Sequence, residues 1–180
     1  MGGLAVQLKK SAIGLSLLAT LALLFGGWFL YQKMEIEEPI RTEVSQMQSA
    51  TLSHFHVGKD KIQIEVKVTN PQTFPAEYRD LVARTKKIAG DKQVAIVVAN
   101  QSEAMTQVWK SGQFVFTEAM DLHQYSRIPS LIAEWKQTNK LDAADAFMDD
   151  ANIYVYLKKG TEDFYTIVPR SEAKEVTARG

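Results

Sequence analysis

KKSAIGLSLLATLALLFGGWFLYQK, from Lys9 to Lys33, is the stretch that decides the architecture of this 180-residue chain. Between Ser11 and Tyr31 it has no charged residue and no proline over 21 positions. A helix of that length rises about 31 Å, which matches the roughly 30 Å hydrocarbon core of a bilayer. A core helix of a soluble protein would carry a polar stripe along one side, and this stretch has none. The pattern therefore predicts a transmembrane helix over residues 11–31.

An apolar run that follows two lysines is also typical of a secretory signal sequence. Two features favour a retained anchor instead. The run is longer than the 7 to 15 apolar residues of a signal sequence, and it ends in bulky Trp28, Phe29 and Tyr31, where a cleavage site needs small residues. Trp and Tyr are enriched where a helix leaves the bilayer. We therefore expect an uncleaved anchor with Trp28 and Tyr31 at the outer membrane interface.

The charges on either side of this run predict its orientation. Lys9 and Lys10 precede it, whereas Lys33 is followed by the acidic segment MEIEEPI. Positive charge near a span favours the cytoplasmic side. We expect residues 1–10 in the cytoplasm, with Lys9 and Lys10 at the inner interface, and the rest of the chain outside it.

Small residues recur every four positions in the run, at Ala12, Ser16 and Thr20. Such a row lets two membrane helices approach closely. It predicts self-association of the anchor, which replacement of Ser16 by Leu should weaken.

The whole chain carries 21 basic and 21 acidic residues and no cysteine. Balanced charge gives no reason to expect a nucleic-acid partner. The absence of cysteine excludes disulfides, thiolate catalysis and Cys-ligated zinc. It fits a bacterial envelope better than a eukaryotic secretory compartment, where such domains often use disulfides.

Residues 34–49 follow the span with Ile40, Val44 and Met47 at helical spacing, which predicts a short juxtamembrane helix or stalk. We expect it to pack on an extracytoplasmic domain over residues 50–169. Residues 170–180 are polar and are expected to form a flexible tail.

The first half of the domain alternates strands with a helix. Apolar and polar residues alternate in KIQIEVKV, and the preceding TLSHFHV should pair with it through a GKD turn. A helix is expected from near Pro75 to Gly90, followed by QVAIVVA, an apolar strand of the kind found inside a sheet. The strand–helix–strand order predicts that the two flanking strands are parallel.

The second half holds two helices and then strands. We expect a long helix from Glu103 to Tyr125, with a kink or a close contact at Gly112, a break at Pro129 and a shorter helix after it. AADAFMD, NIYVYLK and DFYTIVP are strand candidates, the last two forming a hairpin. Its rings should be buried, or else form a partner surface; they are Tyr154, Tyr156, Phe164 and Tyr165. The fold class predicted is α+β, with one mainly antiparallel sheet and helices on one face.

The order of a single span followed by strand, helix and strand resembles small extracytoplasmic domains of bacterial envelope assemblies, including ring-building modules of secretion and sporulation machines. The resemblance covers about 40 residues and includes no motif. It implies a role in assembly, and it assigns no site residue.

Candidate chemistry is sparse. His54 and His56 would share one face of a strand, as two metal ligands do, and His123 or an acidic residue could supply a third ligand; an exposed strand face is the favoured interpretation. The stretch FTEAMDLHQYSR reads as the charged outer face of a helix, and Asp149 and Asp150 as a turn. The chain has no phosphate-binding loop, no nucleophile elbow and no dinucleotide-binding motif, so no catalytic residue, metal or cofactor is assigned.

These observations lead to one leading functional hypothesis, with others kept open. The chain is expected to be a single-pass membrane protein whose outer domain binds or scaffolds a protein partner, or a second copy of itself, without catalysis. The alternatives are a membrane-tethered hydrolase or metal-dependent enzyme that uses the His54 and His56 face, and a ligand-sensing domain. A sensor would need an apolar pocket between helices and sheet.

Overall fold

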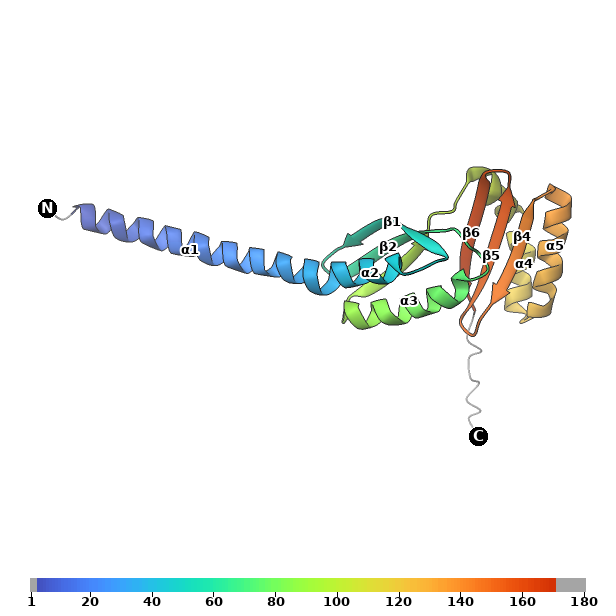
Figure 1. The fold of residues 1–180 in the computed structure, drawn as a ribbon, viewed down its shortest axis with the longest axis horizontal. Helices are drawn as coiled ribbons and strands as arrows, with labels where there is room; N and C mark the ends of the chain where they lie inside the picture. Colours follow the sequence, from blue (N-terminus) through green and yellow to red (C-terminus); the bar gives the residue numbers. More distant parts are fainter. Residues whose placement is uncertain (1–2, 171–180) are drawn as a thin grey trace, which may run out of the picture.

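The computed structural model of the protein describes residues 3–170, with side chains from Ala12 onward. One long helix projects from a folded part made of two lobes (Figure 1). The elements, in chain order, are α1 (Gly3–Tyr31), η1 (Gln32–Glu37), α2 (Glu38–Ser45), β1 (Ala50–Val57), β2 (Lys61–Val68), α3 (Phe74–Ala89), β3 (Gln93–Val98), α4 (Glu103–Asp121), η2 (Tyr125–Arg127), α5 (Ile128–Asn139), β4 (Ala143–Met148), β5 (Asn152–Lys159) and β6 (Glu162–Pro169). The predicted tail, apart from Arg170, lies outside the described residues.

The projecting helix does not end where its apolar stretch ends. From Ala12 to Ser45 it runs as one helix of 34 residues, through the π-helical segment η1 into α2. The wide turn is seen in the bond from the amide of Glu38 to the carbonyl of Lys33, five residues back. Pro39 lacks an amide, and its ring crowds the carbonyl of Glu35, which is a physical reason for a wider turn just before it. The helix predicted to follow the apolar stretch is therefore a continuation of α1, and it ends at Ser45.

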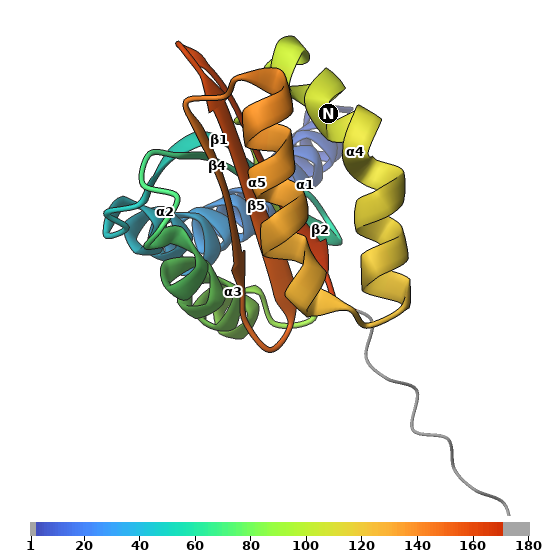
Figure 2. The ribbon, with the colours of Figure 1, turned by 90° about the vertical axis from the view of Figure 1, so that its right-hand side faces the viewer.

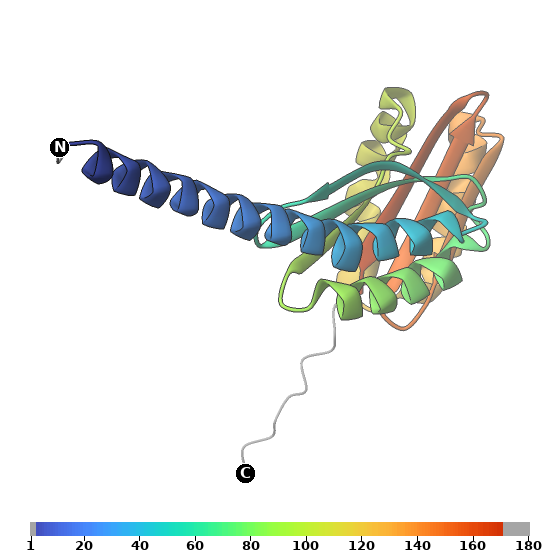
Figure 3. The same ribbon diagram turned by 60° about the vertical axis from the view of Figure 1, so that its left-hand side comes forward.

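The lobe next to α1, hereafter the proximal lobe, contains α2, β1 to β3 and α3. Its sheet has the order β1-β2-β3, with β1 and β2 antiparallel and β2 and β3 parallel, as the sequence predicted. The alternation in β2 buries its isoleucines and valines on one face. Both α2 and α3 lie on that same side of the sheet (Figure 3, cyan-blue and green). The opposite face of the sheet carries the polar residues of β2, which are exposed or half-buried.

The second lobe, hereafter the distal lobe, contains α4, η2, α5 and β4 to β6. Its three strands are antiparallel in the order β4-β5-β6, and α4 and α5 cover one face (Figure 2). Ile153, Val155 and Leu157 of β5 are buried against these helices. At Gly112 of α4, an added Cβ atom would lie 2.0 Å from the ring of Trp135 in α5. The predicted close contact at Gly112 is therefore confirmed.

Aromatic rings of the distal sheet join the two lobes. On the face away from α4 and α5, Tyr154, Tyr156 and Tyr165 are buried in the same hydrophobic cluster as the proximal sheet. The ring of Tyr165 meets that of Phe74 edge-on, with centroids 5.1 Å apart. The predicted burial of the hairpin rings is confirmed, although the proximal lobe, and not a helix layer of the same lobe, covers these three.

Asn100 fixes the segment that crosses between the lobes. Its side-chain amide bonds both backbone groups of Val68, accepting from the N–H at 2.7 Å and donating to the carbonyl at 3.0 Å. The same amide nitrogen donates to Asp163 at 2.5 Å, and the carbonyl of Asn100 accepts from the amide of Tyr165 at 2.8 Å. Asn100 is thus bonded to both lobes at once.

The α+β class is confirmed, but the expectation of one mainly antiparallel sheet is wrong, because the strands form two separate three-stranded sheets. The strand QVAIVV is also not inside a sheet, since β3 lies at an edge and Val97 is exposed. After β3 the chain turns at Asn100 and makes a single bridge, Gln101 to Phe164, with the other sheet. The helix expected to reach Tyr125 ends at Asp121, and Pro129 lies in the first turn of α5, where its missing amide is harmless.

Candidate membrane anchor and its junction with the proximal lobe

The first part of the long helix exposes apolar side chains on all sides. It is long and apolar enough to cross a membrane, with a mean hydropathy of 2.0 in its most apolar window and no residue of that window buried. Trp28 and Tyr31, the residues predicted at the membrane interface, are 56% and 61% exposed near the end of α1. A helix of this kind near an N-terminus has the properties of a membrane anchor and also of a signal sequence.

Ala12, Ser16 and Thr20, the predicted association row, all lie on α1 and are exposed. The hydroxyl of Thr20 donates to the carbonyl of Ser16 at 2.9 Å, so this polar group is satisfied within its own helix. Self-association through the row stays a prediction. The side chains of Lys9 and Lys10 lie outside the described residues.

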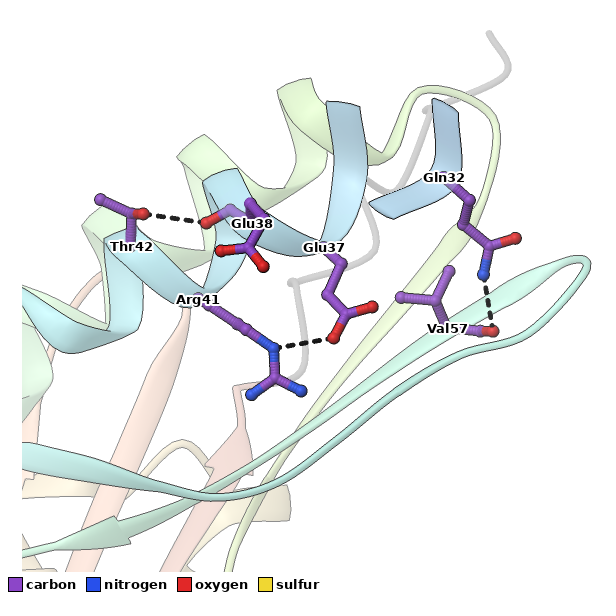
Figure 4. A network of polar contacts seen from close by, with 6 residues as sticks. All are labelled: Gln32, Glu37, Glu38, Arg41, Thr42 and Val57. Atoms are coloured by element: carbon purple, nitrogen blue, oxygen red, sulfur yellow. Dashed lines mark hydrogen bonds and ion pairs between the residues drawn. The ribbon is translucent and has the colours of Figure 1, made fainter. Parts of the chain in front are cut away.

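Polar contacts tie the end of the apolar stretch to the proximal lobe (Figure 4). The side-chain amide of Gln32 donates to the carbonyl of Val57, the last residue of β1, at 3.1 Å. Nine residues further along the helix, the guanidinium of Arg41 donates to Glu37 at 2.9 Å and lies 5.0 Å from the centre of the Phe55 ring. The helix is therefore held against the β1–β2 hairpin from its first residue beyond Tyr31.

Apolar residues of the same helix enter the core of the proximal lobe. Ile36, Ile40 and Val44 are buried, at a spacing of four residues that places them on one side of the helix. They belong to one hydrophobic cluster with β2 and α3. The helix that projects from the protein is thus a structural part of the lobe, and it connects to the lobe without a flexible linker.

Glu77 of α3 holds the turn that follows α2. Its carboxylate accepts hydrogen bonds from the amides of Gln48 and Ser49, each at 3.0 Å, and from the hydroxyl of Ser49 at 2.5 Å. Partial burial by itself would raise the pKa of Glu77, but these hydrogen bonds outweigh it, and the pKa lies below its usual value. The turn is therefore stabilised by an ionised carboxylate.

The two candidate metal ligands lie on the open face of the proximal sheet. His54 and His56 are both exposed on β1, opposite Glu65 and Gln63 of β2. The pairing with β2 shifts by one residue between Leu52 and His54, so Leu52 and Phe55 both face the core and the two histidines face outward. Within the described part of the chain, no three His, Asp or Glu side chains come close enough to hold a metal ion. The pair thus has no third ligand there.

The remaining acidic candidates have structural surroundings. Asp149 lies in the turn before β5, where its carboxylate accepts from the amides of Ala151 and Asn152 and from the hydroxyl of Tyr154 at 2.7 Å. The interpretation of this stretch as a turn is confirmed. Glu118 and Asp121 are exposed on α4, and Arg127 donates to Gln124 at 2.9 Å.

The larger hollows are open grooves at the surface. Two of about 330 and 340 Å³ lie on either side of β6, one against α4 and the other against β3. A third, of about 160 Å³, lies between α2 and α3 and is lined by charged residues, including the ion pair of Arg84 and Glu43 at 2.8 Å. None of these three is the apolar pocket between helices and sheet that a sensor requires. A smaller hollow of about 80 Å³ does lie between helix and sheet in the distal lobe, where mainly apolar residues of η2, α5, β4 and β5 line it, but it is well below the roughly 300–1,000 Å³ of ordinary ligand pockets.

Comparison with protein-family models, with curated proteins and with solved structures finds no match to this chain.

Sequence reasoning missed the residues that fasten the helix to the lobe. Gln32 and Glu77 bond partners 25 to 29 positions away, which leaves no local pattern to read. A signal did exist for Ile36, since it extends the row of Ile40 and Val44 by one step.

Proposed function

We propose that this protein is a single-pass membrane protein of a bacterial envelope, with residues 1–10 in the cytoplasm and both lobes outside it. The observation that carries the proposal is the unbroken helix from Ala12 to Ser45, apolar and exposed in its first part and buried in the lobe core in its second. If the apolar stretch were a signal sequence, cleavage would separate it from the lobe, and the continuous helix that joins the two would have no use. We infer that the anchor is retained and holds the lobes at the membrane surface.

We propose further that the lobes bind a protein partner without catalysis. Exposed apolar side chains at the end of α4 support this role: Phe114 is 86% exposed, and Val115 and Leu122, the residue that caps the helix, are 41% and 56% exposed. Val115 and Leu122 are seven positions apart and so lie on one side of the helix, while Phe114 lies on the neighbouring side. Exposed apolar side chains that gather on one face mark interaction surfaces. The helix α4 belongs to the distal lobe, at the end of the molecule away from α1 (Figure 1).

The chain has no cysteine, so a single introduced cysteine reports its own position. In intact cells, a membrane-impermeant maleimide should label Thr161→Cys in the exposed β5–β6 turn. Labelling only after lysis contradicts the orientation.

Partner binding is tested with a photo-crosslinking amino acid in place of Phe114 and, as control, in place of exposed Thr138 on α5. A defined crosslinked product at Phe114 that is missing at Thr138 supports the proposal. Equal backgrounds at the two positions contradict it.

A further inference from the structure

Three segments that are far apart in sequence meet at the end of the proximal lobe that adjoins α1. Gln32 is bonded to Val57, just before the β1–β2 turn at 58–60. The ammonium of Lys92 donates to the carbonyls of Gly58, at 3.0 Å, and of Lys59, and the amide of Gln93 donates to Asp60 at 2.9 Å. The β1–β2 turn, the start of β3 and the end of α1 are therefore side by side.

These segments are rich in lysine. The stretches 32–35, 57–61 and 86–93 contain six lysines and three acidic residues. In the rest of residues 12–170 there are 11 basic and 16 acidic residues, and the acidic ones include Glu37 and Glu38 directly after the first stretch, so the net positive charge is confined to these three stretches. The lysines, all exposed except the half-buried Lys92, are Lys33, Lys59, Lys61, Lys86, Lys87 and Lys92.

The end of the apolar stretch gives the height of this surface above the bilayer. Gln32 follows Tyr31 by one residue, a rise of about 1.5 Å along a helix. The headgroup layer extends about 5–7 Å beyond the hydrocarbon core on each side. The carbonyl of Val57 lies 3.1 Å from the side-chain amide of Gln32, and the β1–β2 turn lies at the end of the proximal lobe that adjoins α1 (Figure 1). The turn at 58–60 therefore reaches the headgroup layer whenever α1 spans the membrane.

The lobe has little freedom to leave this position. The helix enters it without a linker, and Ile36 and Ile40 are buried in its core. The lysines are therefore held near the bilayer by the fold itself, and their long side chains can extend their ammonium groups to the phosphates.

We propose that this end of the proximal lobe, hereafter the lysine surface, binds the anionic phospholipid headgroups of the bilayer that α1 spans. The inference rests on the proposed membrane insertion of α1, and it adds a second attachment that sets the tilt of the lobes. The occupant is lipid and not a soluble polyanion, because the bilayer surface itself faces these lysines. A basic residue near an anionic membrane surface strengthens binding about fivefold.

The position is tested with the full chain in nanodiscs, with a fluorophore on Asp60→Cys and headgroup-nitroxide lipid as quencher. The control carries the same fluorophore on Thr161→Cys, in the exposed turn of the distal lobe. We expect strong quenching at position 60 and little at 161. Equal quenching at both positions overturns the inference.

The chemistry is tested by raising phosphatidylglycerol in phosphatidylcholine nanodiscs and following the quenching at position 60. The double variant Lys59→Gln, Lys61→Gln should weaken the effect of phosphatidylglycerol on the quenching at position 60. The expected loss is about 25-fold, because each lysine contributes about fivefold, and added salt should weaken the effect further. Lys158→Gln with Lys159→Gln, an equal charge change at exposed sites of the distal lobe, should leave it unchanged. The inference is overturned if the Lys59/Lys61 variant and the Lys158/Lys159 variant respond equally to phosphatidylglycerol. It is also overturned if soluble polyphosphate changes the quenching and phosphatidylglycerol does not.

The two proposals fail differently. If the full chain does not remain in the nanodiscs, the membrane anchor itself is wrong. If the chain remains in the discs and position 60 ignores phosphatidylglycerol, only the lysine surface is wrong.

Discussion

Replacement of Ile40 by Ala tests whether the helix beyond the apolar stretch belongs to the core of the proximal lobe. The side chain of Ile40 is fully buried in the cluster that contains β2 and α3. An Ile→Ala change in a packed core costs about 2–5 kcal/mol, because it removes apolar burial and leaves a cavity. A loss of about 3 kcal/mol is a large part of the 5–15 kcal/mol by which a typical domain is stable.

The assay is urea unfolding of the full chain in detergent, followed by circular dichroism. With a urea dependence of about 2 kcal/mol per molar, the midpoint of Ile40→Ala should fall by about 1.5 M. Arg41→Ala, next to it on the exposed side, removes a surface ion pair and should lower stability by no more than about 1 kcal/mol. Equal midpoints for the two variants would show that α2 is a free stalk and refute the packing described here.

Three further predictions concern single contacts. Gly112→Ala should destabilise the protein by about 1–3 kcal/mol despite the better helix propensity of Ala, because the new Cβ would lie 2.0 Å from the ring of Trp135. Ser111→Ala is the control. An unchanged melting temperature for Gly112→Ala contradicts the close packing of α4 and α5. Asn100→Asp would place a second carboxylate beside Asp163, and the repulsion between the two raises a pKa of the pair in the folded state above its unfolded value. The melting temperature of this variant, relative to that of the native protein, should therefore rise as the pH falls from 7 to 5. A loss of stability that does not change with pH contradicts the contact. The pKa of Glu77 is lowered in the folded state, so its stabilisation is complete above the unfolded pKa near 4.5 and is lost as pH falls through the folded value. Glu77→Gln should therefore be less stable than the native protein at pH 7, and urea midpoints should show this difference shrinking as the pH falls below 4.5.

The elements that a local pattern encodes were predictable from the sequence. The alternation from Lys61 to Val68 gave its strand, and the apolar stretch from Ser11 to Tyr31 gave a helix of membrane-spanning length. Gly112 pointed to a close contact, since its lack of a side chain costs helix stability unless something packs there.

What failed was the assembly of these elements. An apolar run such as QVAIVV indicates that a strand is buried, but not whether a strand or another layer covers it, and β3 lies at an edge. Asn100, which is bonded to both lobes, has partners 32 and 63 positions away, Val68 and Asp163. The junction of α1 with the proximal lobe depends in the same way on distant partners of Gln32. Such contacts appear only once the chain is folded.

The central claim is that the apolar helix is retained, spans the bilayer and continues into the proximal lobe. The most direct test is the intact mass of the protein extracted from carbonate-washed membranes. We predict a chain that still contains Ser11 to Tyr31 and is found in the membrane fraction. A soluble chain that begins after this stretch would contradict the claim.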